Sequence, residues 1–319
     1  MKVSFTKMHG CGNDYIYIDG AKVPEDVRNF AEKKAGLVRR LSDRHFGIGG
    51  DGVIFIHRVP ETAWEELGQQ VDFEMEMYNA DGSRAEMCGN GIRCVAKYVF
   101  DKGWTDQKNI SVVSCGKVKH LELTVKEGKV VNVKVNMGAP VLKTDDIPVI
   151  SERAESVDEE IEADGKIYKM TCVSMGNPHA VIFVNDENIL TGLDNRGGGD
   201  GRNTGEGGTD RFGREMVEGV GSLIEKHPRF PKKTNVEFVK VLDRGNVQMR
   251  VWERGTGETL ACGTGACASA VACILNGLTE EEVTVKLLGG ELKILWDRKE
   301  NLIYMTGPAE TVFDGEVEL

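Results

Sequence analysis

The feature that most constrains the fold is a pair of cysteines that each stand before a glycine and an apolar segment. The stretch "EMCGNGIRCVAKYV" contains Cys88, and "LACGTGACASAVACIL" repeats the arrangement around Cys262. When "FEMEMYNADGSRAEMCGNG" from Phe73 is set above "VQMRVWERGTGETLACGTG" from Val247, the two run without a gap to the cysteines, at an offset of 262 − 88 = 174. This agreement indicates an internal duplication, which has to be recognised before any single motif is interpreted.

Three further segments keep the same order in both halves. "HGCGNDYIYID" resembles "SMGNPHAVIFV", "DGVIFI" resembles "TNVEFVKV", and "LELTVKEGKVVNVKVNMGAP" resembles "ELKILWDRKENLIYMTGPA". The segment after each cysteine is apolar on nearly every side of a helix, which is typical of a buried helix. We therefore predict an α+β fold with two pseudo-twofold-related domains, each an antiparallel-rich sheet wrapped around a central buried helix.

The duplication also predicts the domain boundaries. The first domain should cover residues 1–136 and the second residues 137–307, and the alternating segment 308–319 should join the first domain as a strand. Gly103 and Gly277 are expected at the carboxyl ends of the two central helices, where glycine accepts a left-handed conformation.

One more amphipathic helix is predicted near the amino terminus. Pro24 suits a first helical turn, and apolar residues recur at helical spacing up to about His45, with Phe30 among those on the expected buried face.

The composition excludes several classes of function. The formal net charge of −11 and the pI near 5.2 repel the phosphates of nucleic acids and anionic lipids, and lysine and arginine form no patch. No apolar run approaches the roughly 20 residues of a membrane span, and the amino terminus lacks the apolar core of a signal peptide. We therefore expect a cytoplasmic protein that binds neither nucleic acid nor membrane.

The eight cysteines of such a protein are expected to be reduced thiols rather than a disulfide framework. Cysteine is a common small core residue. We assign to the apolar interior Cys94, Cys115, Cys172, Cys267 and Cys273, and we assign no role to Cys11.

A glycine-rich segment, residues 195–208, has no counterpart in the first half. It lacks the lysine and the preceding strand of a phosphate-binding loop, so a flexible surface insertion is the better interpretation.

The position of the two cysteines suggests acid–base chemistry. A thiol at a helix amino terminus meets unpaired backbone N–H groups and the positive end of the helix dipole, which lower a thiol pKa from its usual value of roughly 8.5. If the two halves pack face to face, Cys88 and Cys262 reach one cleft from opposite sides. One thiolate could then remove a proton from a carbon while the opposite thiol donates one, which inverts the stereocentre.

The same helix ends offer a binding site for the carboxylate beside that carbon. The N–H groups that would hold it, and stabilise the enediolate-like charge, are those of Gly89, Asn90, Gly263 and Thr264.

These motifs carry a family resemblance. Through "KMHGCGNDYIYID", "NADGSRAEMCGNGIRC", "SMGNPHAVIFV", "FPKKTNVEFV" and "WERGTGETLACGTGACA", nearly the whole chain resembles the diaminopimelate epimerases. The resemblance implies interconversion of LL- and meso-diaminopimelate, on the route to lysine and peptidoglycan, without a metal or pyridoxal phosphate. It also implies a homodimer of chains whose two domains close on a diamino dicarboxylic acid substrate.

The resemblance assigns roles to matching positions. Cys88 and Cys262 correspond to the paired base and acid, and His179 and Glu253 to groups that tune the pKa of the thiols. The substrate-binding residues that it implies are Asn13, Asn79, Gly89, Asn90, Asn177, Asn235, Glu253, Arg254, Gly263 and Thr264. Asparagine amides can meet an ammonium and a carboxylate together, and an arginine can clamp a carboxylate.

The chain departs from the family pattern in two places. Many members carry glutamine after the aspartate of the second motif, where this chain has Gly52, so one side-chain contact to substrate is missing. The glycine-rich insertion is also longer than the usual connection.

Three alternatives remain open on the residues alone. A related two-thiol racemase or epimerase of proline or hydroxyproline would use the same paired bases but has little use for Arg254. A structural zinc site would require shorter cysteine spacings and a nearby histidine. A Cys–His hydrolase with His179 as base would leave the second thiol without a role.

Overall fold

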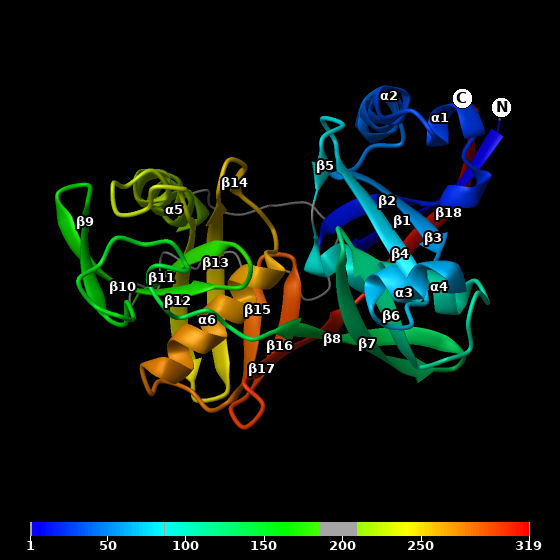
Figure 1. Ribbon diagram of the computed structural model, residues 1–319. Helices are drawn as coiled ribbons and strands as arrows, with labels where there is room; N and C mark the ends of the chain where they lie inside the picture. The colour runs from blue at the N-terminus through cyan, green and yellow to red at the C-terminus, as the bar shows by residue number, and fades with distance from the viewer. Residues whose placement is uncertain (1, 86, 185–208, 319) are drawn as a thin grey trace. The chain divides into compact units, whose positions relative to one another are not determined.

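A computed structural model describes residues 2–85, 87–184 and 209–318 of the chain, which divides into two compact units (Figure 1). Unit 1 contains Met1–Asn136 and Thr306–Leu319, and unit 2 contains Met137–Met305. The segment 195–208, for which we expect a surface insertion, lies outside the described residues. None of the helices in the described ranges is long and apolar enough to cross a membrane.

Unit 1 is built mainly of strands around one long buried helix. Its elements are β1 (Lys2–Gly10), β2 (Asn13–Asp19), η1 (Gly20–Lys22), α1 (Glu25–Arg28), α2 (Ala31–Ser42), β3 (Gly52–Arg58), η2 (Glu61–Ala63), α3 (Trp64–Leu67), β4 (Phe73–Asn79), β5 (Arg84–Ala85), α4 (Gly89–Asp101), β6 (Asn109–Ser114), β7 (Lys117–Lys126), β8 (Lys129–Gly138) and β18 (Glu310–Glu318).

Unit 2 has the same kind of construction. Its elements are β9 (Glu159–Ala163), β10 (Lys166–Ser174), β11 (Pro178–Phe183), α5 (Thr209–Glu225), β12 (Asn235–Asp243), β13 (Asn246–Glu253), β14 (Gly257–Glu258), α6 (Gly263–Leu275), β15 (Glu282–Leu287), β16 (Gly290–Asp297) and β17 (Leu302–Pro308). Strands β8 and β17 each cross a unit boundary, since β8 continues past Asn136 and β17 continues past Met305.

The two units repeat one strand topology. In unit 1, β1 pairs antiparallel with β2, β2 parallel with β3, β3 antiparallel with β4, β4 parallel with β6, and β6 antiparallel with β7. In unit 2 the same sequence of pairings joins β10, β11, β12, β13, β15 and β16. In each unit one further strand pairs with the first strand of this series. Strand β18 pairs with β1, and β9 pairs with β10.

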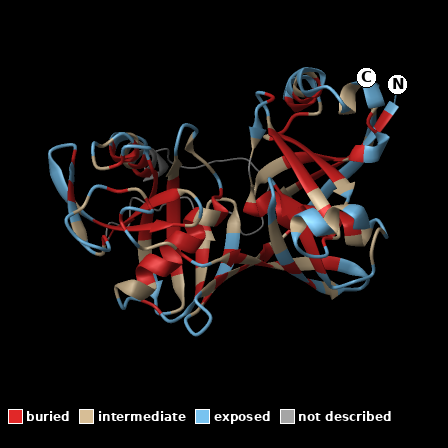
Figure 2. Ribbon diagram, in the orientation of Figure 1, coloured by how far each residue is buried: buried red, intermediate tan, exposed pale blue. Residues whose placement is uncertain are grey.

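The central helices α4 and α6 are buried along most of their length, and both appear red in the burial view (Figure 2). A second helix packs on the other side of each sheet, α2 in unit 1 and α5 in unit 2. The cluster beneath α2 contains Leu37, Val38 and Leu41, and the cluster beneath α5 contains Val217 and Ile224. Each sheet is therefore covered on both faces, which explains why its strands are apolar along their length.

The central helices end as the sequence predicts. Gly103 and Gly277 have φ angles of 70° and 69°, in the left-handed region. Glycine carries no Cβ that would clash in this conformation, so each residue terminates its helix without strain.

The predicted helix from Pro24 to His45 is wrong as a single element. Helix α1 stops at Arg28 and α2 starts at Ala31, because Phe30 is extended (φ −122°, ψ 111°) and 58% exposed. Asparagine and phenylalanine, at positions 29 and 30, are both weak helix formers. Helix α2 stops before Asp43, whose carboxylate accepts hydrogen bonds from the backbone N–H groups of residues 45 and 46.

The assignment of Cys115 to the interior is also wrong. Cys115 is exposed and has a φ of 46°, followed by Gly116 at 74°. These two residues form the hairpin turn between β6 and β7, a turn type that requires positive φ at both positions and projects its side chains into solvent. The other four cysteines assigned to the core, Cys94, Cys172, Cys267 and Cys273, are buried.

Candidate active site

Cys88 caps the amino terminus of α4. It has extended backbone angles (φ −131°, ψ 117°), and its sulfur accepts a hydrogen bond of 3.3 Å from the N–H of Gly91. The thiol also lies 3.2 Å from Oδ1 of Asn13, to which it donates. The sulfur therefore lies among the unpaired N–H groups of a helix start, where a thiolate is stabilised.

A polar chain fixes Asn13 beneath this thiol. Nδ2 of Asn13 donates to Oδ2 of Asp51 at 2.8 Å, and the other oxygen of Asp51 accepts from the guanidinium of Arg44 at 2.9 Å. Arg44 also pairs with Asp14, whose pKa is lowered because hydrogen bonds and charge from Arg44 and Lys7 outweigh the effect of burial. Asp51 and Arg44 are site residues that sequence reasoning missed.

The first turn of α4 is held from behind by a buried arginine. The Arg93 guanidinium, which is 0% exposed, donates to Oδ1 of Asn90 at 3.0 Å, to the carbonyl of Gly89 at 3.1 Å and to that of Pro308 at 3.1 Å. It also donates to the sulfur of Cys11, a buried residue with a φ of 54°. The Asn90 side chain therefore points to Arg93, and its expected role rests on its backbone N–H.

Asn79, the remaining predicted site residue of unit 1, lies at the end of β4. Nδ2 of Asn79 donates to Oγ of Ser83 at 3.1 Å. The departure at Gly52 has a packing reason, because a Cβ there would come within 2.0 Å of the Tyr78 carbonyl oxygen and 2.8 Å of the Tyr15 ring. This backbone leaves no room for any side chain at position 52.

Cys262 caps α6 in the same geometry as Cys88 caps α4. Its backbone angles are φ −120° and ψ 112°, and its sulfur accepts a hydrogen bond of 3.3 Å from the N–H of Gly265. Oγ1 of Thr264 lies 3.5 Å from the sulfur. The negative charge of Glu253 acts on this thiol, and the Glu253 carboxyl group accepts from Oγ1 of Thr259.

The two thiols differ in their surroundings. Cys262 is 5% exposed, and its pKa lies well above the usual thiol value because of burial first, then the negative charges of Glu253 and Glu237. Hydrogen bonds from Thr264 and Gly265 act in the opposite direction but are outweighed. The expectation that a helix start lowers the thiol pKa is therefore wrong for Cys262 in this structure. Burial also raises the pKa of Glu253.

His179 lies in a buried polar row in unit 2. Its Nδ1 is 2.6 Å from Oε1 of Glu237, its Nε2 is 3.0 Å from Oδ1 of Asn177, and both His179 and Glu237 are 0% exposed. Sequence reasoning missed Glu237. The signal was present in "TNVEFV", where an acid interrupts an otherwise apolar strand.

Asn235 and Arg254 are joined to each other at the end of β12 and β13. The Asn235 side chain, buried in the structure, donates to the carbonyl of Pro178 at 2.9 Å and accepts from the backbone N–H of Arg254 at 2.9 Å. The exposed Arg254 places Nη1 3.1 Å from the carbonyl of Lys232. Asn235 thus shapes the backbone at this point, and Arg254 keeps a guanidinium at the surface.

Each unit brings part of its predicted residues together at one helix start, while the contacts of Asn79, Asn177, Asn235 and Arg254 lie elsewhere. Gly89 and Asn90 open α4, next to Cys88 and Asn13, and Gly263 and Thr264 open α6, next to Cys262 and Glu253. This arrangement supplies a thiol and a row of backbone N–H donors in each unit, a combination suited to proton transfer beside a carboxylate.

Known proteins with similar sequences share one description. The family model described as diaminopimelate epimerase matches residues 5–143 and 171–312. Diaminopimelate epimerase of Methanococcus maripaludis strain C5 is 50% identical over 317 residues, 99% of this chain and 100% of that protein. The enzyme of the same description from Acetivibrio thermocellus is 50% identical over 315 residues, 99% of this chain and 98% of that protein.

Solved structures resemble the fold at much lower sequence identity. A hydroxyproline epimerase from Agrobacterium vitis superposes with a TM-score of 0.64 at 14% identity, over 99% of this chain and 91% of that one. A phenazine biosynthesis protein of the PhzF family from Bacillus anthracis gives a TM-score of 0.62 at 13% identity, over 100% of both chains. With the family match, these likenesses confirm the predicted fold class.

Proposed function

We propose, from the premise that this chain belongs to the diaminopimelate epimerase family, that Cys88 and Cys262 are its acid–base pair. The protein is an isomerase that epimerises diaminopimelate in lysine biosynthesis. The observation that carries the proposal is the matched capping geometry, in which each sulfur lies 3.3 Å from an N–H group of the first turn of its helix.

The mechanism requires both sulfurs to act on the same α-carbon. One cysteine, as thiolate, removes the α-proton of LL-diaminopimelate, and the other, as thiol, delivers a proton to the opposite face, which gives the meso form. The two residues exchange roles in the reverse direction. Backbone N–H groups at both helix starts stabilise the enediolate-like charge that develops on the substrate carboxylate.

The remaining side chains bind the substrate or tune the thiols. Glu253 and His179 act on the protonation of the thiols, consistent with the effect of the Glu253 charge on the pKa of Cys262. The groups that we propose to hold the ammonium and carboxylate groups are Asn13, Asn79, Asn177, Asn235 and Arg254, together with the N–H groups of Gly89, Asn90, Gly263 and Thr264.

The test is solvent deuterium incorporation at the α-carbon. Wild-type enzyme, Cys88→Ala and Cys262→Ala are each incubated in D₂O with LL- and with meso-diaminopimelate, and with proline as a substrate of the related racemases. We expect the wild type to incorporate deuterium into both diaminopimelate isomers. Each single variant should lose epimerisation by about 1,000-fold or more, because inversion needs both a base and an acid.

Matched controls exist on the same helices. Cys94→Ala and Cys267→Ala remove thiols that are buried within α4 and α6, and both variants should keep inversion of both isomers. The proposal is wrong if either capping variant still inverts both isomers at the wild-type rate, or if the wild type turns over proline and leaves diaminopimelate unchanged.

We also propose that the enzyme works as a homodimer in the cytoplasm, where its thiols stay reduced. Strand β18 offers apolar surface for a dimer contact, since Val312 is 54% and Phe313 46% exposed. Sedimentation equilibrium of the wild type and of a Val312→Asp, Phe313→Asp variant tests this. A wild-type chain that sediments as a monomer at micromolar concentration contradicts the dimer.

A further inference from the structure

Unit 2 contains a buried carboxylate to which the two-thiol mechanism gives no role. Glu237, on β12, is 0% exposed, and its Oε1 lies 2.6 Å from Nδ1 of His179. Its other oxygen, Oε2, is buried without a hydrogen-bond partner in the described part of the chain. A buried carboxylate is costly unless a charge or a strong donor compensates it. Its presence next to His179 therefore needs an explanation beyond packing.

Glu237 also lies against the first turn of α6. A Cβ added to Gly265 would come within 2.7 Å of Oε1 of Glu237 and within 3.2 Å of the sulfur of Cys262. The carboxylate and the thiol thus approach the same residue of the helix. The positive end of the helix dipole favours an anion at this position.

The duplicated strands of unit 1 show that the fold does not require this ionisable pair. On the parallel strands β11 and β12, His179 pairs with Asn235, two residues before Glu237. On β2 and β3 the matching pair is Tyr15 and Gly52, two residues before Ile54.

The contacts of the helix confirm the correspondence. A Cβ on Gly91 of α4 would meet Cδ1 of Ile54 at 2.9 Å, as one on Gly265 would meet Glu237. Tyrosine and isoleucine therefore fill in unit 1 the positions that histidine and glutamate fill in unit 2. The architecture thus accepts an apolar side chain in place of Glu237, so the fold itself does not require the ionisable pair of unit 2.

We propose that Glu237 is a positioning residue of the epimerase reaction, which holds His179 with a hydrogen on Nδ1 and so directs Nε2 toward Asn177. An ionised carboxylate 2.6 Å from Nδ1 can only accept, so that nitrogen carries the hydrogen. Nε2 lies 3.0 Å from Oδ1 of Asn177, which can only accept, so in this arrangement Nε2 donates a hydrogen to Asn177 and is the ring nitrogen that can lose its proton beside a substrate-binding side chain. This inference rests on the proposed function.

The same carboxylate bears on the second thiol. Among the described residues, the charge of Glu237 raises the pKa of three titratable groups, which are Cys262 at the cap of α6, Glu253 of β13 and Cys172 of β10. Glu237 thus helps Cys262 to keep its proton in the direction in which Cys262 is the acid.

Glu237→Gln tests the proposal because it keeps the size and the acceptor oxygen but removes the charge. We expect kcat to fall by about 10- to 100-fold, while KM changes by less than about twofold, because the substrate contacts remain. The basic limb of the pH profile of kcat/KM should move to lower pH, since loss of the anion lowers the pKa of Cys262. Glu237→Asp, which restores the charge, should return the limb toward its wild-type position.

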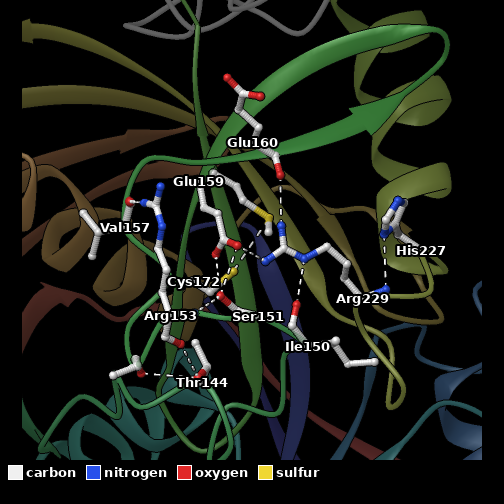
Figure 3. Close-up of polar contacts among 12 residues, drawn as sticks. Thr144, Ile150, Ser151, Arg153, Val157, Glu159, Glu160, Cys172, His227 and Arg229 are labelled. Atoms are coloured by element: carbon white, nitrogen blue, oxygen red, sulfur yellow. Dashed lines mark hydrogen bonds and ion pairs between the residues drawn. The ribbon is translucent and has the colours of Figure 1, made fainter.

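Glu159→Gln is the matched control. Glu159 belongs to a different polar network of unit 2, where it accepts from Ser151 and pairs with Arg229 at 2.6 Å (Figure 3). This variant should keep the wild-type pH profile. A Glu237→Gln enzyme with wild-type kcat and pH profile overturns the proposal, as does an equal loss in both variants without a shift of the limb. Neither result would contradict the proposed function, because that proposal is tested separately by the cysteine variants.

A measurement on the wild type covers the case in which Glu237→Gln does not fold. The ring ¹⁵N signals of His179, assigned by their loss in His179→Gln, report which nitrogen carries hydrogen. We expect Nδ1 to stay protonated between pH 6 and about pH 9. A signal that shows Nδ1 without hydrogen at pH 8 contradicts the proposal.

Discussion

Units 1 and 2 place a cysteine at the same point of the same topology but surround it with different side chains. The capping geometry is duplicated closely, with a sulfur 3.3 Å from a backbone N–H in each unit. The neighbours are not duplicated. The three corresponding pairs are Tyr15 and His179, Ile54 and Glu237, and Asn79 and Glu253. Unit 2 therefore has two acids and a histidine where unit 1 has a phenol, an alkyl group and an amide.

This difference separates two tasks of the site. Binding a carboxylate at a helix start depends on backbone N–H groups, which any duplicated copy retains. Control of the proton depends on ionisable side chains, and these gather in unit 2, where the pKa of Cys262 is raised well above its usual value.

The largest effect that tests this comparison is expected at the Asn79 and Glu253 pair. Glu253→Gln removes the acid whose charge raises the pKa of Cys262 and should lower kcat by about 1,000-fold, within the range of general acid–base catalysis. Asn79→Ala, which loses the contact to Ser83, should lower kcat/KM by about tenfold, mainly through KM. Steady-state kinetics in both directions measure the two effects.

The Asp101→Asn variant provides the control, since Asp101 pairs with Lys97 at the far end of α4. It should affect stability without lowering kcat or kcat/KM in either direction. Equal losses of kcat in Glu253→Gln and Asn79→Ala would show that proton control is not concentrated in unit 2.

Much of the architecture could be predicted because the duplication is visible as a gapless alignment. The apolar segments after Cys88 and Cys262 became α4 and α6, and Gly103 and Gly277 ended them. These features depend on local sequence, namely a capping residue, apolar side chains on every face and a terminal glycine, so they can be recognised without tertiary information.

The residues that sequence reasoning missed depend on pairing between distant segments. Glu237 meets His179 because β11 and β12 pair in parallel, with a register that places Asn235 beside His179. Asp51 supports Asn13 from the residue just before β3. A single sequence shows that an acid interrupts an apolar strand, but not which side chain the acid faces. The break between α1 and α2 was missed because the apolar pattern continues across Phe30.

A second comparison concerns how the stability of the fold depends on pH through Glu76. Its counterpart in unit 2, at the offset of 174 residues, is Arg250. Burial opposes ionisation of Glu76, but hydrogen bonds with His57 at 3.1 Å, Lys34 at 2.9 Å and Tyr78 at 2.8 Å lower its pKa from 4.5 to about 2. A lowered folded-state pKa stabilises the protein above pH 4.5, and that stability is lost as pH falls toward 2. Glu76→Gln should cost about 3 kcal/mol at pH 7.

Urea denaturation of the wild type and Glu76→Gln between pH 7 and pH 3 measures this contribution. The difference in unfolding free energy should shrink to roughly half by pH 3, because Glu76 is then almost fully protonated in the unfolded chain but only about one-tenth protonated in the folded one. Glu122→Gln, which breaks an exposed pair with Lys134, should cost less than about 0.5 kcal/mol at every pH. A pH-independent difference for Glu76→Gln would contradict the assignment.

The smallest effect is expected at the two glycines of the helix starts. Alanine in place of glycine favours a helix by about 1 kcal/mol, while overpacking costs about 1–3 kcal/mol. In Gly91→Ala the new Cβ meets Cδ1 of Ile54 at 2.9 Å, the end of a side chain that can rotate away, so the net change should be near zero. In Gly265→Ala it meets Oε1 of Glu237 at 2.7 Å, an atom held by His179, so a net loss of about 1–2 kcal/mol is expected.

Urea denaturation of the two variants measures the difference, and a third variant locates its cause. If Glu237 is the obstacle, Gly265→Ala should cost much less in a Glu237→Ala background, because the carboxylate that it meets is gone and the two changes are then non-additive. Additive costs would mean that Gly265 is needed for another contact, such as the 3.2 Å approach to the sulfur of Cys262. The glycine would then serve the thiol directly, and the two helix starts would be more alike than their neighbours suggest.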